Sequence, residues 1–305
     1  MHMPHDASPH AAFHDLEDVA ACELFGSPTA EPPSLLIEIP HGATEREQFD
    51  PLRAQLRGAL PDDLAAFFHV NTDVGAPELG AAIARELAAA GRSTLVVRCL
   101  LPRTFVDTNR SLAPGTPPGM SAGIPSYVTD AADRALLGEL HATYVAAVER
   151  AYAAICGTGG MALALHTYAP RSVDAEIDAD IAASLRRAYV PAVFRTWPLR
   201  PEVDLITATP EGEELAPPGL PEAVATALEA VWIESGRNAT YTLHPATQGL
   251  LFSRRYPQRV LCLEVRRDLL GAPWRPFAPT RIGPRKALRL ARPIASALSA
   301  FLPAR

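Results

Sequence analysis

The chain has 305 residues, 48% of them hydrophobic, and a formal net charge of −6 at pH 7. Its length is sufficient for one large α/β domain, and the acidic balance argues against nucleic acid or an anionic membrane as the main partner. No run approaches the roughly 18 apolar residues of a membrane span. The cysteines are scattered without a CxxC spacing, which is typical of a reduced compartment. We therefore expect a cytoplasmic protein that acts on a small molecule.

The first 30 residues are predicted to be a flexible N-terminal segment. They include His2, His5, His10 and His14 among Pro, Ala and Ser residues. They lack the charged and apolar regions of a secretory signal. We expect residues 31–305 to form a single catalytic domain, whose oligomeric state the sequence does not indicate.

The first half of this domain contains short strands and helices in alternation. Apolar periodicity and turn residues predict strands at Ser34–Ile39, Ala66–Val70 and Thr94–Leu100, and helices at Gln48–Leu60 and Pro77–Ala90. Pro near the start and Gly just after the end are typical of a helix such as the second of these.

A polar segment, Pro102–Arg110, follows the strand at Thr94–Leu100. If the segment is extended, Arg103, Phe105, Asp107 and Asn109 point to one side. The Pro- and Gly-rich stretch Ser111–Tyr127 comes next, and a long loop of this kind is often a lid or a binding loop.

The second half continues the alternation. The predicted elements are helix Asp130–Cys156, strand Met161–Leu165, helix Ala175–Tyr189, strand Val203–Ala208, helix Pro221–Glu234, strand Arg259–Leu263 and a final helix from Pro284 to about Leu302. This order predicts an α/β fold with a mostly parallel sheet covered by helices on both faces.

Three residues suited to metal binding or proton transfer lie at the ends of predicted strands. His41 follows the first strand, His166 follows Met161–Leu165, and Glu264 follows Arg259–Leu263. Ligands bind at the carboxyl ends of strands in open α/β sheets. Asp73 precedes a predicted helix, where it could also serve as a helix cap. Each histidine, taken alone, is more often a hydrogen-bonded structural residue than a metal ligand.

Six segments, in their order and spacing, resemble the N-formylglutamate amidohydrolase family, relatives of the zinc carboxypeptidases. The segments are IPHGA at Ile39–Ala43, NTDVGAPEL at Asn71–Leu79, RTFVDTNR at Arg103–Arg110, ALHTY at Ala164–Tyr168, GRNATYT at Gly236–Thr242 and CLEV at Cys262–Val265. The resemblance implies a phosphorylase/hydrolase-like, three-layer α/β sandwich with a mostly parallel mixed sheet. It also implies that residues 31–305 are a metallohydrolase domain with one zinc ion per chain.

The resemblance implies that His41, Asp73 and His166 are the zinc ligands. Two imidazoles and one carboxylate would leave a fourth position of a catalytic zinc open for water. Glu45 and Glu78 also lie near these residues in the sequence, and both remain alternatives to Asp73.

The same resemblance assigns the remaining roles. Glu264 would be the general base that takes a proton from the activated water, and Arg103 would face the scissile carbonyl. Asn109 and Arg110 would hold a substrate carboxylate, which a guanidinium can bind with two parallel hydrogen bonds. The alternative for Glu264 is a structural salt bridge, for instance with Arg103 or Arg254.

We therefore expect a zinc-dependent amidohydrolase that cleaves the amide of an N-acyl amino acid similar to N-formylglutamate. A metallocarboxypeptidase acting on short peptides and a non-catalytic ligand-binding relative are the alternatives. The chain departs from the family where the His41 turn reads HGATE, where Ala164 replaces Asp in the Asp-x-His-Ser pattern, and where Thr108 replaces Leu in DLNR. These departures leave the acyl group and the amino acid open.

Overall fold

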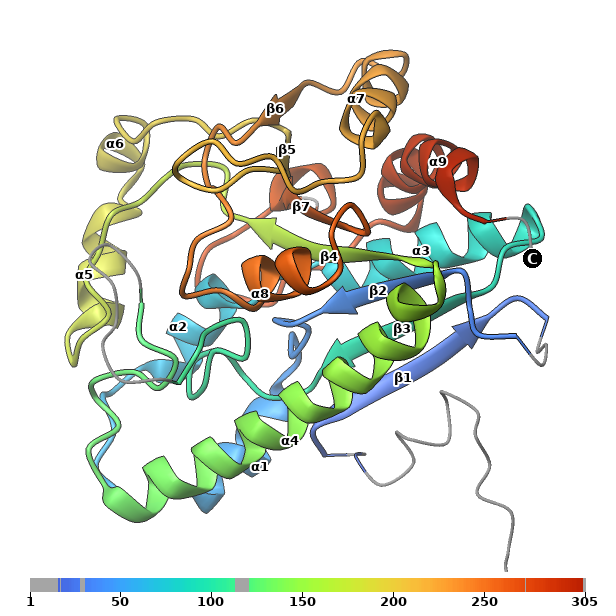
Figure 1. Cartoon of the computed structure of the whole chain (residues 1–305). Coiled ribbons are helices and arrows are strands. Elements are labelled where there is room, and N and C mark those ends of the chain that lie inside the picture. The colour runs from blue at the N-terminus through green and yellow to red at the C-terminus, as the bar shows by residue number, and fades with distance from the viewer. Residues whose placement is uncertain (1–15, 17, 28–30, 113–120, 272, 304–305) are drawn as a thin grey trace, which may run out of the picture.

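The strands of the computed structural model form one mixed sheet (Figure 1). The structure describes residues 16, 18–27, 31–112, 121–271 and 273–303. Within these ranges the strands are β1 (Ala20–Phe25), β2 (Leu35–Ile39), β3 (Thr94–Cys99), β4 (Met161–Tyr168), β5 (Val203–Ile206), β6 (Ser235–Arg237) and β7 (Val260–Arg266). The helices are α1 (Arg46–Gln55), α2 (Leu64–Asn71), α3 (Ala76–Ala89), α4 (Ala131–Ile155), α5 (Ile181–Ala188), α6 (Pro191–Phe194), α7 (Leu220–Glu229), α8 (Gln248–Arg255) and α9 (Pro284–Phe301).

The strands lie in the order β1-β3-β2-β4-β7-β5-β6. The central strands β3, β2, β4 and β7 are parallel to one another. β1 is antiparallel to β3, and β5 is antiparallel to β7 and parallel to β6. The mostly parallel mixed sheet that we expected is therefore confirmed.

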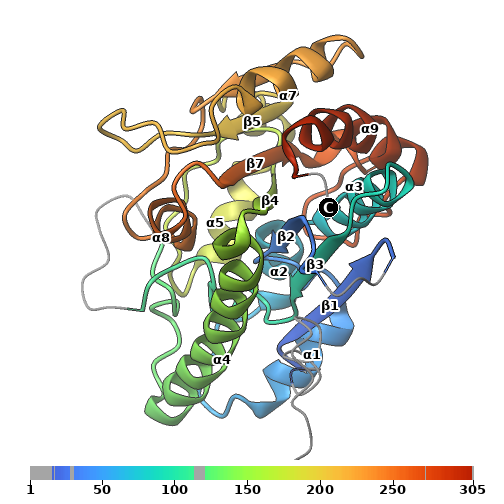
Figure 2. The same ribbon diagram turned by 45° about the vertical axis from the view of Figure 1, so that its right-hand side comes forward.

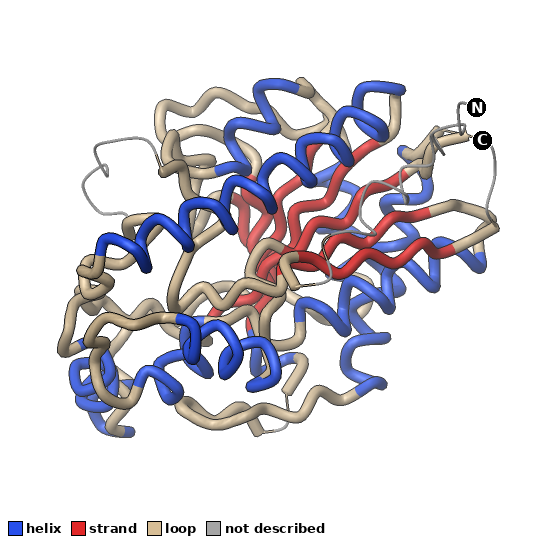
Figure 3. The backbone as a smooth tube through the Cα atoms, turned by 90° about the horizontal axis from the view of Figure 1, so that it is seen from below, coloured by secondary structure: helices blue, strands red, loops and turns tan. Residues whose placement is uncertain are grey.

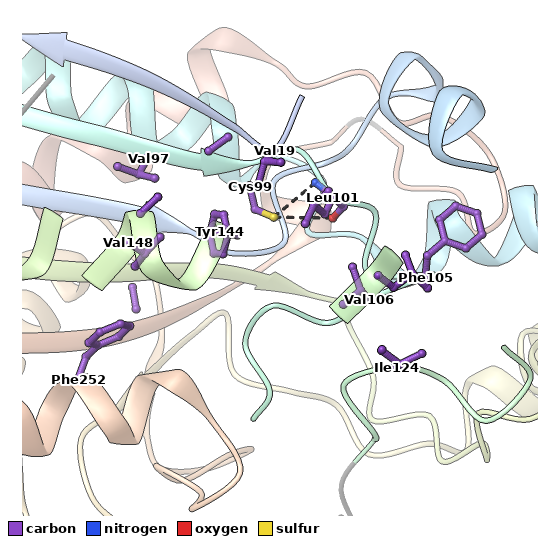
Figure 4. Packing of buried hydrophobic residues seen from close by; sticks show 14 of the residues in the cluster. Val19, Val97, Cys99, Leu101, Phe105, Val106, Ile124, Tyr144, Val148 and Phe252 are labelled. Carbon is purple, nitrogen blue, oxygen red and sulfur yellow. Dashed lines mark hydrogen bonds between the residues drawn. The ribbon is translucent and has the colours of Figure 1, made fainter. Parts of the chain in front are cut away.

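Helices cover both faces of the sheet, which makes three layers (Figures 2 and 3). On one face, α3, α7 and α9 pack against strand residues such as Ile37, Leu163 and Leu263. On the other face, α4 and α8 pack against alternate strand residues, and Figure 4 shows Tyr144 and Val148 of α4 beside Val97 of β3. The central strands are apolar on both sides because both of their faces are buried.

The long helix α4 agrees closely with the helix predicted at Asp130–Cys156. The side chain of Asp130 caps it by accepting hydrogen bonds from the backbone N–H groups of Ala132 and Asp133, at 2.9 and 3.0 Å. Within the ranges that the structure describes, neither this helix nor any other is long and apolar enough to cross a membrane.

One predicted strand is wrong. Residues 66–70 belong to helix α2, in which almost every side chain is buried. A short apolar run has the same appearance in a buried strand and in a buried helix, so its periodicity does not separate the two. The predicted helix at Ala175–Tyr189 begins only at Ile181, and the one at Pro221–Glu234 ends at Glu229.

Four elements were not predicted: strands β1 and β6 and helices α6 and α8. β1 lies inside the segment 1–30 that we expected to be flexible, and it pairs with β3 along its whole length. Residues 1–15, 17 and 28–30 of that segment lie outside the described residues, as do residues 113–120 of the predicted loop at Ser111–Tyr127.

Candidate active site

His41, Asp73 and His166 meet at the carboxyl end of the central strands. His41 follows β2, His166 lies near the end of β4, and Asp73 lies in the turn between α2 and α3. The Nδ1 atoms of the two histidines are 3.2 Å apart, and they lie 3.3 Å (His41) and 3.0 Å (His166) from Oδ2 of Asp73. All three side chains are buried, and their ligand atoms lie within 4.8 Å of one another.

Backbone contacts fix the turn that carries Asp73 against the end of β2. The N–H group of Asp73 donates to the carbonyl oxygen of His41 at 3.3 Å, and the Thr72 hydroxyl donates to the same oxygen at 3.3 Å. The buried Arg267 donates to the other carboxylate oxygen of Asp73 at 3.5 Å and to the carbonyl of Thr167 at 3.1 Å. Oδ2 of Asp73 is thus left to face the two imidazoles.

Asp107 orients the His41 ring from the other side. Nε2 of His41 lies 2.8 Å from Oδ1 of Asp107, so the proton on Nε2 is donated to this carboxylate and Nδ1 keeps its lone pair. Burial raises the pKa of Asp107, but Arg103 and Arg110 outweigh it and hold this pKa well below its usual range. An anionic Asp107 that holds an imidazole in one tautomer is a common outer partner of a metal-binding histidine.

Sequence reasoning gave no role to Asp107 or Arg267. Asp107 belongs to the RTFVDTNR segment, and this position was the one feature of the sequence that could have indicated a role at the site. Arg267 follows Glu264 by three residues, but nothing in the sequence indicated that it would reach Asp73.

From the sequence, we considered an extended conformation for the segment Pro102–Arg110. The segment is not extended. Its backbone forms successive turns, with the N–H of Phe105 bonded to the carbonyl of Pro102 at 2.9 Å and the N–H of Arg110 bonded to the carbonyl of Asp107 at 3.1 Å. Phe105 is therefore buried in the core rather than at the site. Arg103 still reaches the site, because its Nε donates to Oδ2 of Asp107 at 2.9 Å.

Glu264 is the direct neighbour of His166 across the parallel pair β4–β7. Its Oε2 atom is buried and has no hydrogen-bond partner among the described residues. Burial raises the pKa of Glu264 from its usual 4.5 to about 7, with His166 acting in the opposite direction and Asp73 adding to the rise. This carboxyl group can therefore exchange a proton near neutral pH.

The salt-bridge alternative for Glu264 finds no partner in the structure. Arg103 is paired with Asp107 at 2.9 Å, and Arg254 is paired with Glu213 at 3.0 Å. Over the part of the chain that the structure describes, no ion pair involves Glu264.

The raised pKa of Glu264 predicts a pH-dependent difference in stability between the metal-free wild type and a Glu264→Gln variant. In the unfolded wild type Glu264 ionises above its usual pKa of 4.5, whereas in the folded protein it ionises only above about pH 7. Between these two values ionisation favours the unfolded state, so the free energy of unfolding of the wild type falls as pH rises from 4.5 to about 7. Gln cannot ionise. The free energy of unfolding of the variant relative to wild type should therefore increase by about 3 kcal/mol between about pH 4 and pH 8.

Urea unfolding of both metal-free proteins at several pH values measures this difference. A difference that does not change with pH would contradict the raised pKa.

A hollow of about 290 Å³ opens beside these groups, and Asn109 and Arg110 line it together with His41, His166 and Glu264. The Nε atom of Arg110 is buried and has no hydrogen-bond partner among the described residues. Its Nη1 atom donates to the carbonyl of Asn109 at 3.3 Å. Its Nε atom also lies 3.9 Å from Oδ2 of Asp107, so Arg110 shares this acid with Arg103 while it lines the hollow. We call this space the carboxylate hollow, after the carboxylate that Asn109 and Arg110 are expected from the sequence to bind.

The loop before α8 holds this part of the site in place. Arg110 forms an isolated antiparallel bridge with Thr247, and the amide oxygen of Asn109 accepts a hydrogen bond from the N–H of Gly249 at 3.4 Å. Ile206 and Leu243 add an apolar wall to the carboxylate hollow.

The two alternative carboxylates are not part of the buried group that could hold a metal ion. Glu45 and Glu78 are exposed, and the group of buried ligand-type residues contains only Asp73 as its acid. Glu78 lines a larger hollow of about 760 Å³, whose lining residues come mainly from β1, α3 and α9 and include none of the groups described above.

The comparisons with known proteins establish the fold. The N-formylglutamate amidohydrolase of Ralstonia eutropha JMP134 is similar with a TM-score of 0.53 and 19% sequence identity, over 90% of this chain and 97% of that one. A gene product of Agrobacterium tumefaciens is similar with a TM-score of 0.54 and 13% identity, over 93% and 94% of the two chains. No family model and no curated protein sequence matches. The structural relationship to the N-formylglutamate amidohydrolase fold, inferred from the six segments, is confirmed.

Proposed function

We propose that the chain is a metal-dependent amidohydrolase that cleaves the amide of an N-acyl amino acid, with N-formylglutamate as one member of the substrate class. The observation that carries the proposal is the position of Glu264. Glu264 is partly buried, and its buried Oε2 atom has no hydrogen-bond partner among the described residues. The side chain lies beside His166 and lines a hollow that also contains Arg110. An unpaired buried acid is costly to keep for stability alone.

The donor atoms suit zinc. Atoms held tetrahedrally at about 2.0 Å from zinc lie about 3.3 Å from one another. The separations among His41 Nδ1, His166 Nδ1 and Asp73 Oδ2 are 3.0 to 3.3 Å. Two imidazoles and a carboxylate, with the outer partners Asp107 and Arg267, are also a typical ligand set for a catalytic zinc ion. A bound zinc ion would act as a Lewis acid and make water easier to deprotonate.

The side chains around this centre have three separate roles: proton transfer, stabilisation of negative charge and substrate binding. Glu264, with a pKa of about 7, accepts a proton from the attacking water and passes it to the departing amine. Arg103, held by Asp107, places positive charge where the amide oxygen becomes negative. Arg110 and Asn109 bind the carboxylate of the amino acid and set the position of the amide.

Arg110→Leu tests the substrate class. Loss of a charge-assisted bidentate contact should weaken transition-state binding of a free acid by roughly 2–4 kcal/mol, seen as a lower kcat/KM. The methyl ester of the same N-acyl amino acid lacks the anionic carboxylate, so its hydrolysis should change far less. The measurement is kcat/KM for N-acetylleucine, N-formylglutamate and their methyl esters.

Arg255→Leu is the matched control, because Arg255 is an exposed arginine paired with Glu149 and does not line the carboxylate hollow. If Arg110→Leu keeps the wild-type preference for acid over ester, the carboxylate binds elsewhere. If the zinc-loaded wild type hydrolyses none of these amides, the proposed class is wrong.

A further inference from the structure

A second hollow, of about 220 Å³, adjoins the carboxylate hollow. Arg103, Tyr241 and Glu264 line both, and Asp73 lines the second as well. A substrate held by Arg110 with its amide beside Glu264 therefore has two spaces available, one for its amino acid part and one for its acyl part. We call the second space the acyl hollow.

The acyl hollow is rich in positive charge. Its lining contains four arginines and two carboxylates, namely Arg103, Arg171, Arg200 and Arg267 against Asp73 and Glu264. Two of the arginines already form ion pairs, Arg103 with Asp107 and Arg267 with Asp73. Arg171 and Arg200 are the two that remain.

Arg171 is held by neutral groups. Its Nη1 atom donates to the carbonyl oxygen of Trp197, and its guanidinium carbon lies 6.0 Å from the centre of the Phe194 ring. These contacts position the side chain without neutralising its charge.

Arg200 is held in the same manner. It donates to the hydroxyl of Ser172 at 3.0 Å and to the hydroxyl of Tyr241 at 2.9 Å. Its guanidinium carbon lies 4.9 Å from the centre of the Tyr168 ring and 5.4 Å from that of the Tyr241 ring. Because Tyr241 lines both hollows, Arg200 contacts a residue that also borders the carboxylate hollow.

Among the described residues, neither cation forms an ion pair with a protein acid, although Glu264 lines the same hollow and interacts electrostatically with Arg200. Across the described residues, no ion pair within 4.0 Å involves Arg171 or Arg200, and both side chains are partly buried. The nearby acids Asp174 and Glu176 are exposed and line a neighbouring hollow instead. Two guanidinium groups that are held by neutral partners and form no ion pair among the described residues, in a hollow beside the reacting groups, are suited to bind a carboxylate.

We propose that the acyl hollow binds a carboxylate on the acyl group, so that the substrate is an N-acyl amino acid whose acyl part is a dicarboxylic acid, such as a succinyl or glutaryl group. The inference rests on the proposed function, in which Arg110 binds the amino acid part of the substrate and the acyl part therefore lies in the acyl hollow. A formyl group would leave most of the acyl hollow empty and carries no carboxylate for Arg171 and Arg200 to bind.

A matched pair of ligands tests this inference: N-succinylleucine and its analogue in which the distal carboxylate is an amide. Binding is measured by calorimetry on zinc-loaded Glu264→Gln protein, and kcat/KM is measured on the zinc-loaded wild type. The distal carboxylate should improve binding on the order of tenfold to a hundredfold, because contacts to charged groups are the stronger ones. Arg171→Gln and Arg200→Gln should each reduce this preference, and the double variant should abolish it.

Arg200→Lys keeps the positive charge and should retain part of the preference, which separates loss of charge from loss of packing. Arg254→Gln is the control, since Arg254 is exposed, pairs with Glu213 and lines neither hollow. Equal binding of the two ligands, absence of binding, or a preference that survives in the double variant would overturn the inference. If neither compound is hydrolysed but the binding preference follows the two arginines, the proposed reaction fails and the carboxylate site stands. If both are hydrolysed and bound equally, the reaction stands and the carboxylate site fails.

Discussion

Glu264→Gln is expected to lower the turnover of N-acyl amino acids by a factor of about 10² to 10⁴, the usual contribution of a positioned acid–base group. Gln keeps the shape of Glu and can still form hydrogen bonds, but it cannot accept the proton of the attacking water. Zinc content should stay near that of wild type, because the donor atoms of His41, Asp73 and His166 do not include Glu264.

Glu264→Gln also tests whether Glu264 has a structural role instead of a catalytic one. If Glu264 neutralised a buried cation, its replacement would destabilise the protein by about 3–5 kcal/mol and leave turnover largely intact. Its unpartnered oxygen predicts the opposite, namely an inactive protein that is at least as stable as wild type near neutral pH. Turnover, zinc content and thermal midpoint measured on one preparation separate the two cases.

Glu38→Gln is the matched control for this experiment. Glu38 is also a buried glutamate near the site, but it lies on β2 and accepts hydrogen bonds from the hydroxyls of Tyr152 at 2.8 Å and Tyr144 at 3.3 Å. It lines neither hollow, so turnover should change far less than in Glu264→Gln. A comparable loss in both variants would mean that the effect comes from disturbing the core.

His166→Ala is expected to remove the bound zinc ion. The variant loses one of the three proposed ligands, so the loss of affinity should exceed the 10- to 100-fold that removal of an outer partner typically costs. His69→Ala is the control, because His69 is a buried histidine of α2 outside the ligand group. Elemental analysis after dialysis should show one zinc ion less per chain in His166→Ala than in wild type.

The comparison between variant and wild type also removes the contribution of the histidines near the N-terminus. His2, His5, His10 and His14 are present in both proteins, so any zinc they bind cancels in the difference. Equal zinc content in His166→Ala and wild type would remove His166 from the ligand set.

The central sheet could be predicted from the sequence because its strands carry a local signal. β2, β4 and β7 are short apolar runs that continue into polar residues with ligand chemistry, and parallel strands bring those ends to one edge. The meeting of His41, His166 and Glu264 followed from that rule. The strand predicted at Ala66–Val70 failed because burial on all sides removes the periodicity that separates helix from strand.

Other parts of the site depend on contacts between distant segments, which the sequence does not display. The pairing of Asp107 with His41 spans 66 residues, and that of Arg267 with Asp73 spans 194. The choice of Asp73 over Glu45 and Glu78 likewise required the fold, because all three acids lie close to His41 or to one another in sequence. The residues that line the acyl hollow come from several separate segments, and no single stretch of sequence indicates that they meet.

The most direct test of the central claim is a zinc titration of metal-free protein, with hydrolysis of an N-acyl amino acid as the readout. Wild-type activity should be absent after chelation, rise linearly with added zinc and reach a plateau when the site of His41, Asp73 and His166 is filled. His166→Ala should stay inactive over the same range. Full activity in the chelated wild type, or activity restored equally in His166→Ala, would contradict a metal-dependent amidohydrolase at this site.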